Sequence, residues 1–250
     1  MTAVSARAQP AQQAPPVQKL RVRYAKRGRA RFTSSRDFGR AFERALRRAG
    51  VPMAYSSGYS PHPRISYANA SPTGAASEAE YLEIGLSRAC EPDQVRAALD
   101  AALPPGLDIV EVVAAPTGAL ADLLTASRWR VDVVGVAPAV LDAAVQAVLA
   151  EESVVVQRMT KSGLRAFDVR QAVVSVARTT EAGDSATTAS QHLELLTLHQ
   201  EPLVRPDDVL TAMAQLVPDF APTEVPVLTR LRQGRLDATS GELSDPFAPR

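Results

Sequence analysis

Residues 34–50, SSRDFGRAFERALRRAG, carry the clearest structural pattern in the chain. Apolar residues recur there at intervals of three and four from Phe38 to Ala49, which is typical of a helix that packs one face on a core. Asp37 stands three residues after Ser34, as in a capping box, and a glycine follows the last apolar position. We therefore predict a helix here. Four arginines lie away from its apolar face: Arg40, Arg44, Arg47 and Arg48.

The segments on either side of this helix predict strands and a second helix. Residues 19–25, KLRVRYA, alternate apolar and basic residues, so they predict a half-buried strand with Arg21 and Arg23 on its outer face. The further elements expected are strands at residues 65–68, 78–86 and 107–113 and a helix that begins at Pro92. This order, βαββαβ, is that of the ferredoxin-like split βαβ unit.

The rest of the chain predicts the same order with one added strand. Strands are expected at residues 129–134, 154–157, 167–176, 192–198 and 226–231, and helices at residues 138–150 and 206–216. The fold class expected is α+β, with tandem ferredoxin-like (βαββαβ) domains and antiparallel sheets. The expected divisions are a disordered lead (1–18), a first domain (19–114), a connector (115–127), a second domain (128–232) and a flexible tail (233–250).

Composition excludes several classes of protein. Of the 250 residues, 46% are hydrophobic and 22% charged, which is close to the average for globular proteins and excludes a wholly disordered chain. No stretch has the apolar run of a signal peptide or of a membrane span, so we expect a cytoplasmic protein without membrane contact. Cys90 is the only cysteine, and no Cys/His set has metal-ligand spacing, so we expect no internal disulfide, metal or cofactor.

Charge is distributed unevenly along the chain. Residues 19–64 hold thirteen Lys and Arg but only two acidic residues, Asp37 and Glu43, which gives +11, whereas the remainder carries −10. Such asymmetry indicates a polyanionic partner for the basic segment, and we expect RNA. The alternative interpretation is that the acidic remainder folds over this segment and neutralises it.

The loop at residues 55–64, YSSGYSPHPR, presents a histidine between two prolines. Pro61 and Pro63 restrict the backbone on either side of His62, and Arg64 follows on the same side. An imidazole beside a guanidinium suits phosphate contact or proton transfer, although a loop histidine can also simply stabilise a turn. We expect this loop and the basic residues to share one exposed flank. The candidate nucleic-acid contacts are Arg21, Arg23, Arg40, Arg44, Arg47, Arg48, Tyr59, His62 and Arg64.

Three motifs resemble the radical SAM-linked protein family, an uncharacterised domain. They are AFERALRRAG (41–50), GYSPHPR (58–64) and the pair Ser77-Glu78 followed by Glu80-Tyr81-Leu82. Members occur as a separate chain or fused behind a radical S-adenosylmethionine enzyme with a cobalamin-type domain, which implies an accessory role beside such an enzyme. The family pattern has Ser-His at the start of the first helix, where this chain has Ser34-Ser35. A catalytic role for that histidine would therefore be impaired here.

Together these observations favour a non-catalytic, RNA-binding or substrate-presenting accessory protein of a radical SAM enzyme. Because Cys90 stands alone, the chain lacks the three-cysteine motif of such enzymes, and a separate chain would have to supply the iron–sulfur cluster. One alternative is a metal-independent endoribonuclease in which His62 is the general acid or base and Arg64 stabilises the transition state. Another is a protein–protein adaptor that docks through the arginine-bearing helix.

Overall fold

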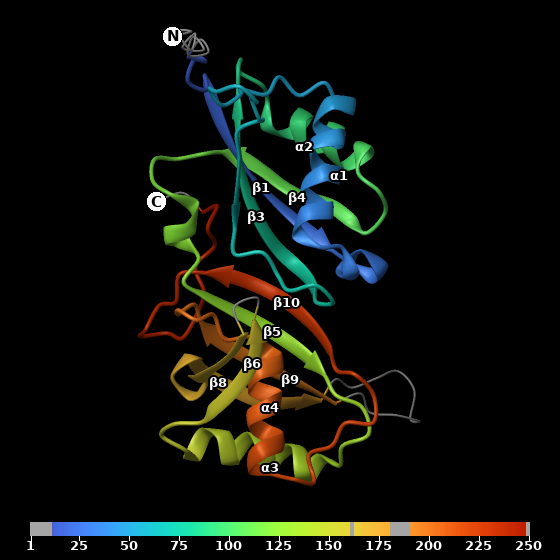
Figure 1. Cartoon of the computed structure of the whole chain (residues 1–250), viewed down its shortest axis with the longest axis vertical. Coiled ribbons are helices and arrows are strands. Elements are labelled where there is room, and N and C mark those ends of the chain that lie inside the picture. Colours follow the sequence, from blue (N-terminus) through green and yellow to red (C-terminus); the bar gives the residue numbers. More distant parts are fainter. Residues whose placement is uncertain (1–11, 161–162, 181–190, 249–250) are drawn as a thin grey trace, which may run out of the picture. The chain divides into compact units, whose positions relative to one another are not determined.

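The computed structural model describes residues 12–160, 163–180 and 191–248. In these residues the chain is an α+β protein with a large, mostly antiparallel sheet and four α-helices (Figure 1). It divides into two compact units, and the first comprises residues up to Ala70 together with Glu80–Gly118. The second comprises Ser71–Ala79 and the residues from Ala119 onward. None of the described helices is long and apolar enough to cross a bilayer.

The first unit has the element order expected from the sequence. Its elements are β1 (Gln18–Lys26), the 3-10 helix η1 (Gly28–Phe32), α1 (Ser35–Arg48), β2 (Ile65–Ala68), residues 80–86 of β3 (Ala76–Leu86), α2 (Pro92–Ala102) and β4 (Leu107–Ala114). The strand order is β4-β1-β3-β2. Strands β1 and β4 pair antiparallel, with a bulge between Arg23 and Tyr24, and β2 pairs antiparallel with β3.

The two helices of this unit cover one face of its strands. Phe42 and Leu46 of α1 and Leu99 of α2 are buried against apolar residues of the sheet. Leu20 and Val22 of β1 belong to the same core. Because side chains alternate along a strand, Lys19, Arg21 and Arg23 lie on the opposite, helix-free face.

The second unit contains the remaining elements. They are the 3-10 helix η2 (Leu120–Leu123), β5 (Ala126–Asp132), α3 (Pro138–Ala150), β6 (Val155–Thr160), β7 (Gly163–Asp168), the 3-10 helix η3 (Arg170–Ala172), β8 (Val173–Thr180), β9 (Gln191–Leu198), α4 (Pro206–Leu216) and β10 (Val227–Gly234). Strands β10, β5, β9 and β8 are neighbours in that order, and each pair is antiparallel. Residues of β3 pair parallel with β10 at Ala76 and Ser77, while β6 and β7 form a separate hairpin.

One expected strand, at residues 167–176, is wrong because the chain turns within it. Strand β7 ends at Asp168, and β8 begins at Val173 after η3. The Asp168 carboxylate accepts hydrogen bonds from the backbone N–H groups of Val154 and Arg170, both at 2.9 Å. This carboxylate holds the reversal and is the physical reason for two strands instead of one.

The two ends of the chain also differ from expectation. Residues 1–11 of the expected disordered lead lie outside the described residues, but the Val17 N–H donates to the Leu86 carbonyl at 2.8 Å. The expected flexible tail begins inside β10, and its Leu236 and Leu243 form a bridge. Leu243 is buried with Ala126 and a leucine of β9, so apolar contact orders this segment.

The domain boundaries also differ from those expected, because contacts between residues distant in the sequence decide them. Ser71–Ala79, expected within the first domain, belongs to the second unit because its Ala76 and Ser77 pair with β10. The expected connector, residues 115–127, is divided at Gly118, and its last two residues begin β5.

Candidate nucleic-acid interface

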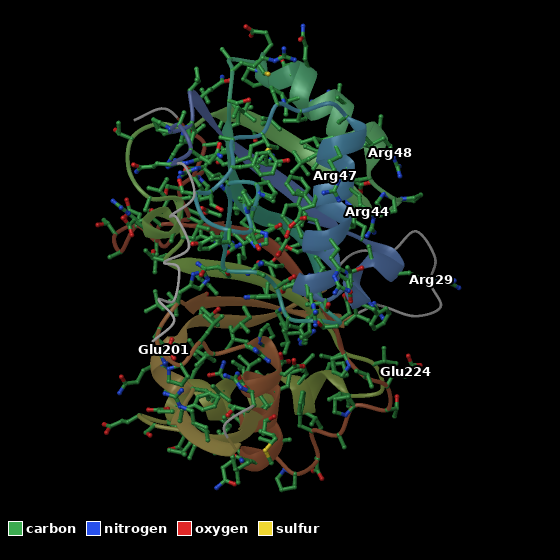
Figure 2. The ribbon with its side chains drawn as sticks, turned by 45° about the horizontal axis from the view of Figure 1, so that its top comes forward. Arg29, Arg44, Arg47, Arg48, Glu201 and Glu224 are labelled. Carbon is green, nitrogen blue, oxygen red and sulfur yellow. The ribbon has the colours of Figure 1, made fainter. Side chains whose placement is uncertain are left out.

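The helix α1 carries the exposed basic residues of the first unit. Its first turn is fixed by Ser34, whose Oγ accepts from the Asp37 N–H at 3.2 Å and donates to the Asp37 carboxylate at 2.7 Å. The buried stripe that includes Phe38 and Phe42 sets the rotation of the helix. Arg40, Arg44, Arg47 and Arg48 are consequently exposed, and Figure 2 shows the last three along α1.

Most of these arginines have no carboxylate partner among the described residues. Arg40, Arg44 and Arg47 form no ion pair or hydrogen bond there, whereas Arg48 donates to the Ala102 carbonyl at the end of α2, at 3.1 Å. Arg36 is also exposed and unpaired within the same residues, and it extends the series by one helical turn. The four-residue spacing from Arg40 back to Arg36 is the sequence signal that would have identified it.

We name Arg36, Arg40, Arg44 and Arg47 the α1 arginine face. Successive members that are four residues apart lie about 6 Å apart along the helix axis, because an α-helix rises 1.5 Å per residue. Each guanidinium can present two parallel N–H donors to a phosphate or a carboxylate. The face can therefore bind an extended polyanion.

The basic residues of β1, in contrast, are paired with carboxylates of the same unit. Arg21 is 1% exposed, lies 3.4 Å from Glu83, and donates to the Gly118 carbonyl at 2.8 Å. Arg23 pairs with Glu111 at 3.2 Å. The expectation that Arg21 contacts nucleic acid is therefore corrected, since Arg21 is buried, whereas a contact by the partly exposed Arg23 stays a prediction.

Two further bases, one in this strand and one in the turn after it, follow the same pattern. Lys19 pairs with Glu83 at 2.9 Å, and Arg27 pairs with Asp108 at 2.9 Å. Neutralisation by acidic residues thus applies to these bases in and just after β1. The α1 arginine face, in contrast, has no carboxylate partner among the described residues.

The loop that contains His62 is stiffly built. The Ser56 N–H donates to the His62 carbonyl at 2.8 Å, and the His62 N–H donates to Ser56 Oγ at 3.0 Å. Tyr55 and Pro63 form a β-bridge, and Arg64 Nε donates to the Tyr55 carbonyl at 3.1 Å. The rigid presentation expected from the two prolines is therefore reinforced by hydrogen bonds across the loop.

His62 and Arg64 line a cleft of about 340 Å³. Lys19 and Glu83, from β1 and β3, also line it, as does Ser66 of β2. Because Lys19 and Glu83 alternate with core residues, this cleft lies on the helix-free face of the strands. Tyr59 of the same loop is 68% exposed but does not line the cleft.

The α1 arginine face and this cleft do not form the single flank that we expected. They lie on the two sides of the strands, and the segment around Tyr55 and Pro63 occupies the edge between them. Arg47 lines a small pocket with both residues. The first unit thus has two separate candidate surfaces, with Arg47 nearest to the edge that separates them.

A serine–histidine pair in the second unit is absent from the expected site residues. Ser127 Oγ lies 2.7 Å from His199 Nε2, and His199 Nδ1 lies 2.7 Å from the Leu124 carbonyl. Since a carbonyl only accepts, Nδ1 donates, and Nε2 of the neutral ring accepts from Ser127. Burial lowers the pKa of His199. Ser127 is only 1% exposed, so this pair joins η2 to β5 and β9 and offers no accessible nucleophile.

No three His, Cys, Asp or Glu residues in the described ranges are grouped to hold a metal ion. Tyr67, on β2, lies beside Phe38 with its ring at 79°, and burial with the nearby Glu43 raises its pKa to about 12. Its hydroxyl therefore stays protonated at neutral pH.

Comparison with known proteins places the chain in a family but identifies no activity. One solved structure, described as "an Unknown Protein from Galdieria sulphuraria", is 16% identical, with 85% of this chain and 98% of that chain covered and a TM-score of 0.24. No curated protein matches the chain. Residues 19–206 match the family model described as "Uncharacterized protein conserved in bacteria (DUF2344)". The match spans most of the 250 residues, and the chain therefore belongs to this family of bacterial proteins.

Proposed function

We propose that this protein binds RNA through the α1 arginine face. The observation that carries the proposal is that four exposed arginines on one helix have no carboxylate partner among the described residues. A phosphate backbone offers one negative charge per nucleotide, so an extended strand can contact several of these arginines at once. Such contacts fix the position of the strand without reading its sequence.

The composition of the α1 arginine face favours RNA over an acidic protein surface. Stable protein interfaces have an apolar centre enriched in aromatic residues. The large apolar residues of α1, Phe38, Phe42 and Leu46, are buried in the core of the unit. The outer side of the helix therefore provides charge without an apolar centre, which suits a polyphosphate.

On the resemblance to the radical SAM-linked proteins, we further propose that the bound RNA is presented to a radical SAM enzyme on a separate chain. This role places the protein in the cytoplasm. Co-purification of such an enzyme that depends on RNA would support the presenting role. An association that survives nuclease and high salt would instead support the protein–protein adaptor.

We also propose that both units are ferredoxin-like repeats. The order β4-β1-β3-β2 in the first unit corresponds to β10-β5-β9-β8 in the second. In this comparison the hairpin β6–β7 is an insertion between α3 and β8. The helices α1 and α3 would then be equivalent, yet α3 (PAVLDAAVQAVLA) contains no arginine, so only the first repeat would hold RNA.

The experiment is a salt titration of RNA binding by the triple variant Arg40→Gln, Arg44→Gln, Arg47→Gln. Arg48 is left unchanged because it donates to the end of α2. The loss of three phosphate contacts should weaken binding by about tenfold or more and reduce the slope of log K against log salt by about 2 for a single strand. Fluorescence anisotropy with a labelled oligoribonucleotide measures both quantities.

Two control variants separate charge from folding. The triple Arg→Lys variant keeps the charge and should retain most of the affinity, with a similar salt slope. The variant Arg88→Gln removes an exposed arginine of the same unit outside α1 and should bind as the unmodified protein does. Unchanged binding by the triple Arg→Gln variant would reject the α1 arginine face.

A second candidate function, RNA cleavage, is supported by one observation: His62, Arg64 and Lys19 line the same cleft. In this function His62 is the general acid or base, and the two cationic groups stabilise the charge that develops on the phosphate. Incubation with RNA in the presence of a chelator tests it. Cleavage must occur, and His62→Ala must abolish it.

A further inference from the structure

The backbone around the cleft beside His62 is held by hydrogen bonds within the first unit. The Arg64 N–H donates to the Ala54 carbonyl at 2.8 Å, and the Gly85 N–H donates to the Arg64 carbonyl at 2.9 Å. The first bond joins the two arms of the loop, and the second ties the loop to β3. Pro16, from the segment before β1, also lines the cleft. Because the backbone of the cleft is already held, ligand binding has to order only its exposed side chains.

Three side chains with hydrogen-bond donors meet in this cleft. Arg64 uses its Nε for the Tyr55 carbonyl, which leaves both of its terminal amino groups without a partner among the described residues. The exposed His62 ring is also unpartnered there. Lys19 is 59% exposed and uses one of its three donors for Glu83. All three line the cleft and have donors to offer an anionic group bound there.

The charge of the cleft is positive despite Glu83. That carboxylate is paired twice, with Lys19 at 2.9 Å and with the buried Arg21 at 3.4 Å. Two cations around one carboxylate leave one positive charge, and Arg64 adds a second. The total matches a terminal phosphate, which carries about −1.5 to −2 at neutral pH, better than an internal phosphodiester with one charge.

We propose that this cleft binds the terminal phosphate of a nucleotide. Arg64, His62 and Lys19 contact the phosphate, and Glu83 accepts from a sugar hydroxyl. The volume of about 340 Å³ lies at the lower end of the range for small-ligand sites, so it suits one nucleotide and not an oligonucleotide segment. The free nucleotide and the phosphorylated end of an RNA strand share this chemistry.

The three histidines of the chain make imidazole NMR a direct test. Adenosine 5′-monophosphate is titrated into the full-length protein, and the ring ¹⁵N resonances are followed in a long-range correlation spectrum. Only the His62 signals should shift. His192 is 3% exposed, and His199 is held by Ser127 and Leu124, so these two rings serve as internal controls. Adenosine without phosphate should bind at least about tenfold more weakly, because charge-assisted hydrogen bonds are lost.

Two variants test the site by different means. Arg64→Gln should weaken the binding of adenosine 5′-monophosphate by about 10- to 100-fold. Ser66→Trp places a large side chain in the cleft from an exposed position of β2 and should block binding without removing a charge. Arg88→Gln is the control for a lost arginine outside the cleft. Circular dichroism checks that each variant is folded, and if Arg64→Gln is unfolded the Ser66→Trp result decides.

The two sources of the phosphate are distinguished with 5′-phosphorylated and 5′-hydroxyl pentaribonucleotides of the same sequence. Preference for the phosphorylated strand assigns the site to RNA ends, whereas binding of the mononucleotide alone assigns it to a free nucleotide, and either supports the proposal. Equal binding of adenosine and adenosine 5′-monophosphate, or no shift of His62, overturns it. The triple α1 variant should bind adenosine 5′-monophosphate normally, so this proposal and RNA binding by α1 can fail independently.

Discussion

Arg21 shows that the role of a basic residue depends on its burial. Its side chain is 1% exposed and contacts Glu83 and the Gly118 carbonyl, while Arg23, two residues later, is 30% exposed beside Glu111. Removing one member of a buried pair leaves its partner in a poorly solvated site, which is costly. Exposed pairs contribute little because water screens them. The two arginines should therefore differ in their effect on stability.

We predict that Arg21→Ala lowers the free energy of unfolding by about 3 kcal/mol and leaves RNA affinity unchanged in the folded fraction. Arg23→Ala, the matched control, should change stability by about 1 kcal/mol or less. Urea unfolding followed by circular dichroism gives the stabilities, and anisotropy gives the affinities. If Arg21→Ala lost RNA affinity but kept normal stability, Arg21 would have to be counted among the RNA contacts after all.

His199 should make stability depend on pH. Burial lowers the pKa of its ring in the folded protein, while the unfolded chain has the ordinary value of about 6.5. As the pH falls below about 6.5, the unfolded state binds more protons than the folded state, so the free energy of unfolding decreases. This contribution to stability is complete above the unfolded pKa and is lost towards acid pH.

The measurement is the difference in unfolding free energy between the unmodified protein and His199→Gln from pH 7.5 to pH 5. We expect this difference to shrink as the pH falls, because the variant has no proton to bind. The difference is used because other groups also titrate. Burial raises the pKa of Asp207 and of Asp208, and a raised carboxyl pKa increases the free energy of unfolding as the pH falls. A difference that stays constant with pH would show that His199 does not titrate between the two states.

At the scale of elements, the sequence was most informative where apolar spacing alone decides the structure. The helix α1 begins at Ser35, where Ser34 and Asp37 predict it, and its buried residues are those of the apolar stripe. The strand expected at residues 167–176 was wrong because its apolar run is interrupted by a turn. That turn depends on the Asp168 carboxylate meeting the Val154 N–H, a contact between distant residues that local spacing does not reveal.

The segment after β10 was misread for a related reason. Its many Gly, Ser and Asp residues are typical of a flexible tail, but they form turns in which Asp237 accepts from the N–H groups of Thr239 and Ser240 at 2.8 and 3.0 Å. These turns bring Leu243 onto the sheet face that carries Ala126. The few apolar residues of this polar segment, such as Leu236 and Leu243, show no sustained periodicity, so the docking could not be predicted.

We predict that Leu243→Ala lowers the free energy of unfolding by about 2–3 kcal/mol, because Leu243 is 4% exposed and its truncation leaves a cavity beside Ala126 and Leu196. Glu242→Ala, at a neighbouring exposed position, should cost less than about 1 kcal/mol. Chemical denaturation compares the two. If both variants are as stable as the unmodified protein, the segment contributes nothing to the fold.

For the whole molecule, the uneven charge of the sequence indicated a polyanionic partner but not where that partner binds. The basic residues behind the excess of +11 in residues 19–64 fall into two groups in the structure, those paired with carboxylates and those that are not. Four bases in and just after β1 meet carboxylates of β3 and β4, which come from later in the chain. The α1 arginine face meets none within the described residues. Which bases are paired depends on which strands lie side by side, and a single sequence does not specify the strand order.

This division predicts where RNA crosslinks along the chain. After ultraviolet irradiation of the full-length protein bound to RNA, digestion and mass spectrometry should recover crosslinked peptides from residues 29–48 and, through the exposed Tyr59, from the loop at residues 55–64. Peptides from residues 119–248 should carry none, because these residues hold eleven Lys and Arg against seventeen Asp and Glu, and a net negative charge repels phosphate. In the triple α1 variant the crosslinks at residues 29–48 should disappear, whereas Arg88→Gln should leave the map unchanged. Crosslinks confined to the second unit would place the RNA site there and contradict the assignment to α1.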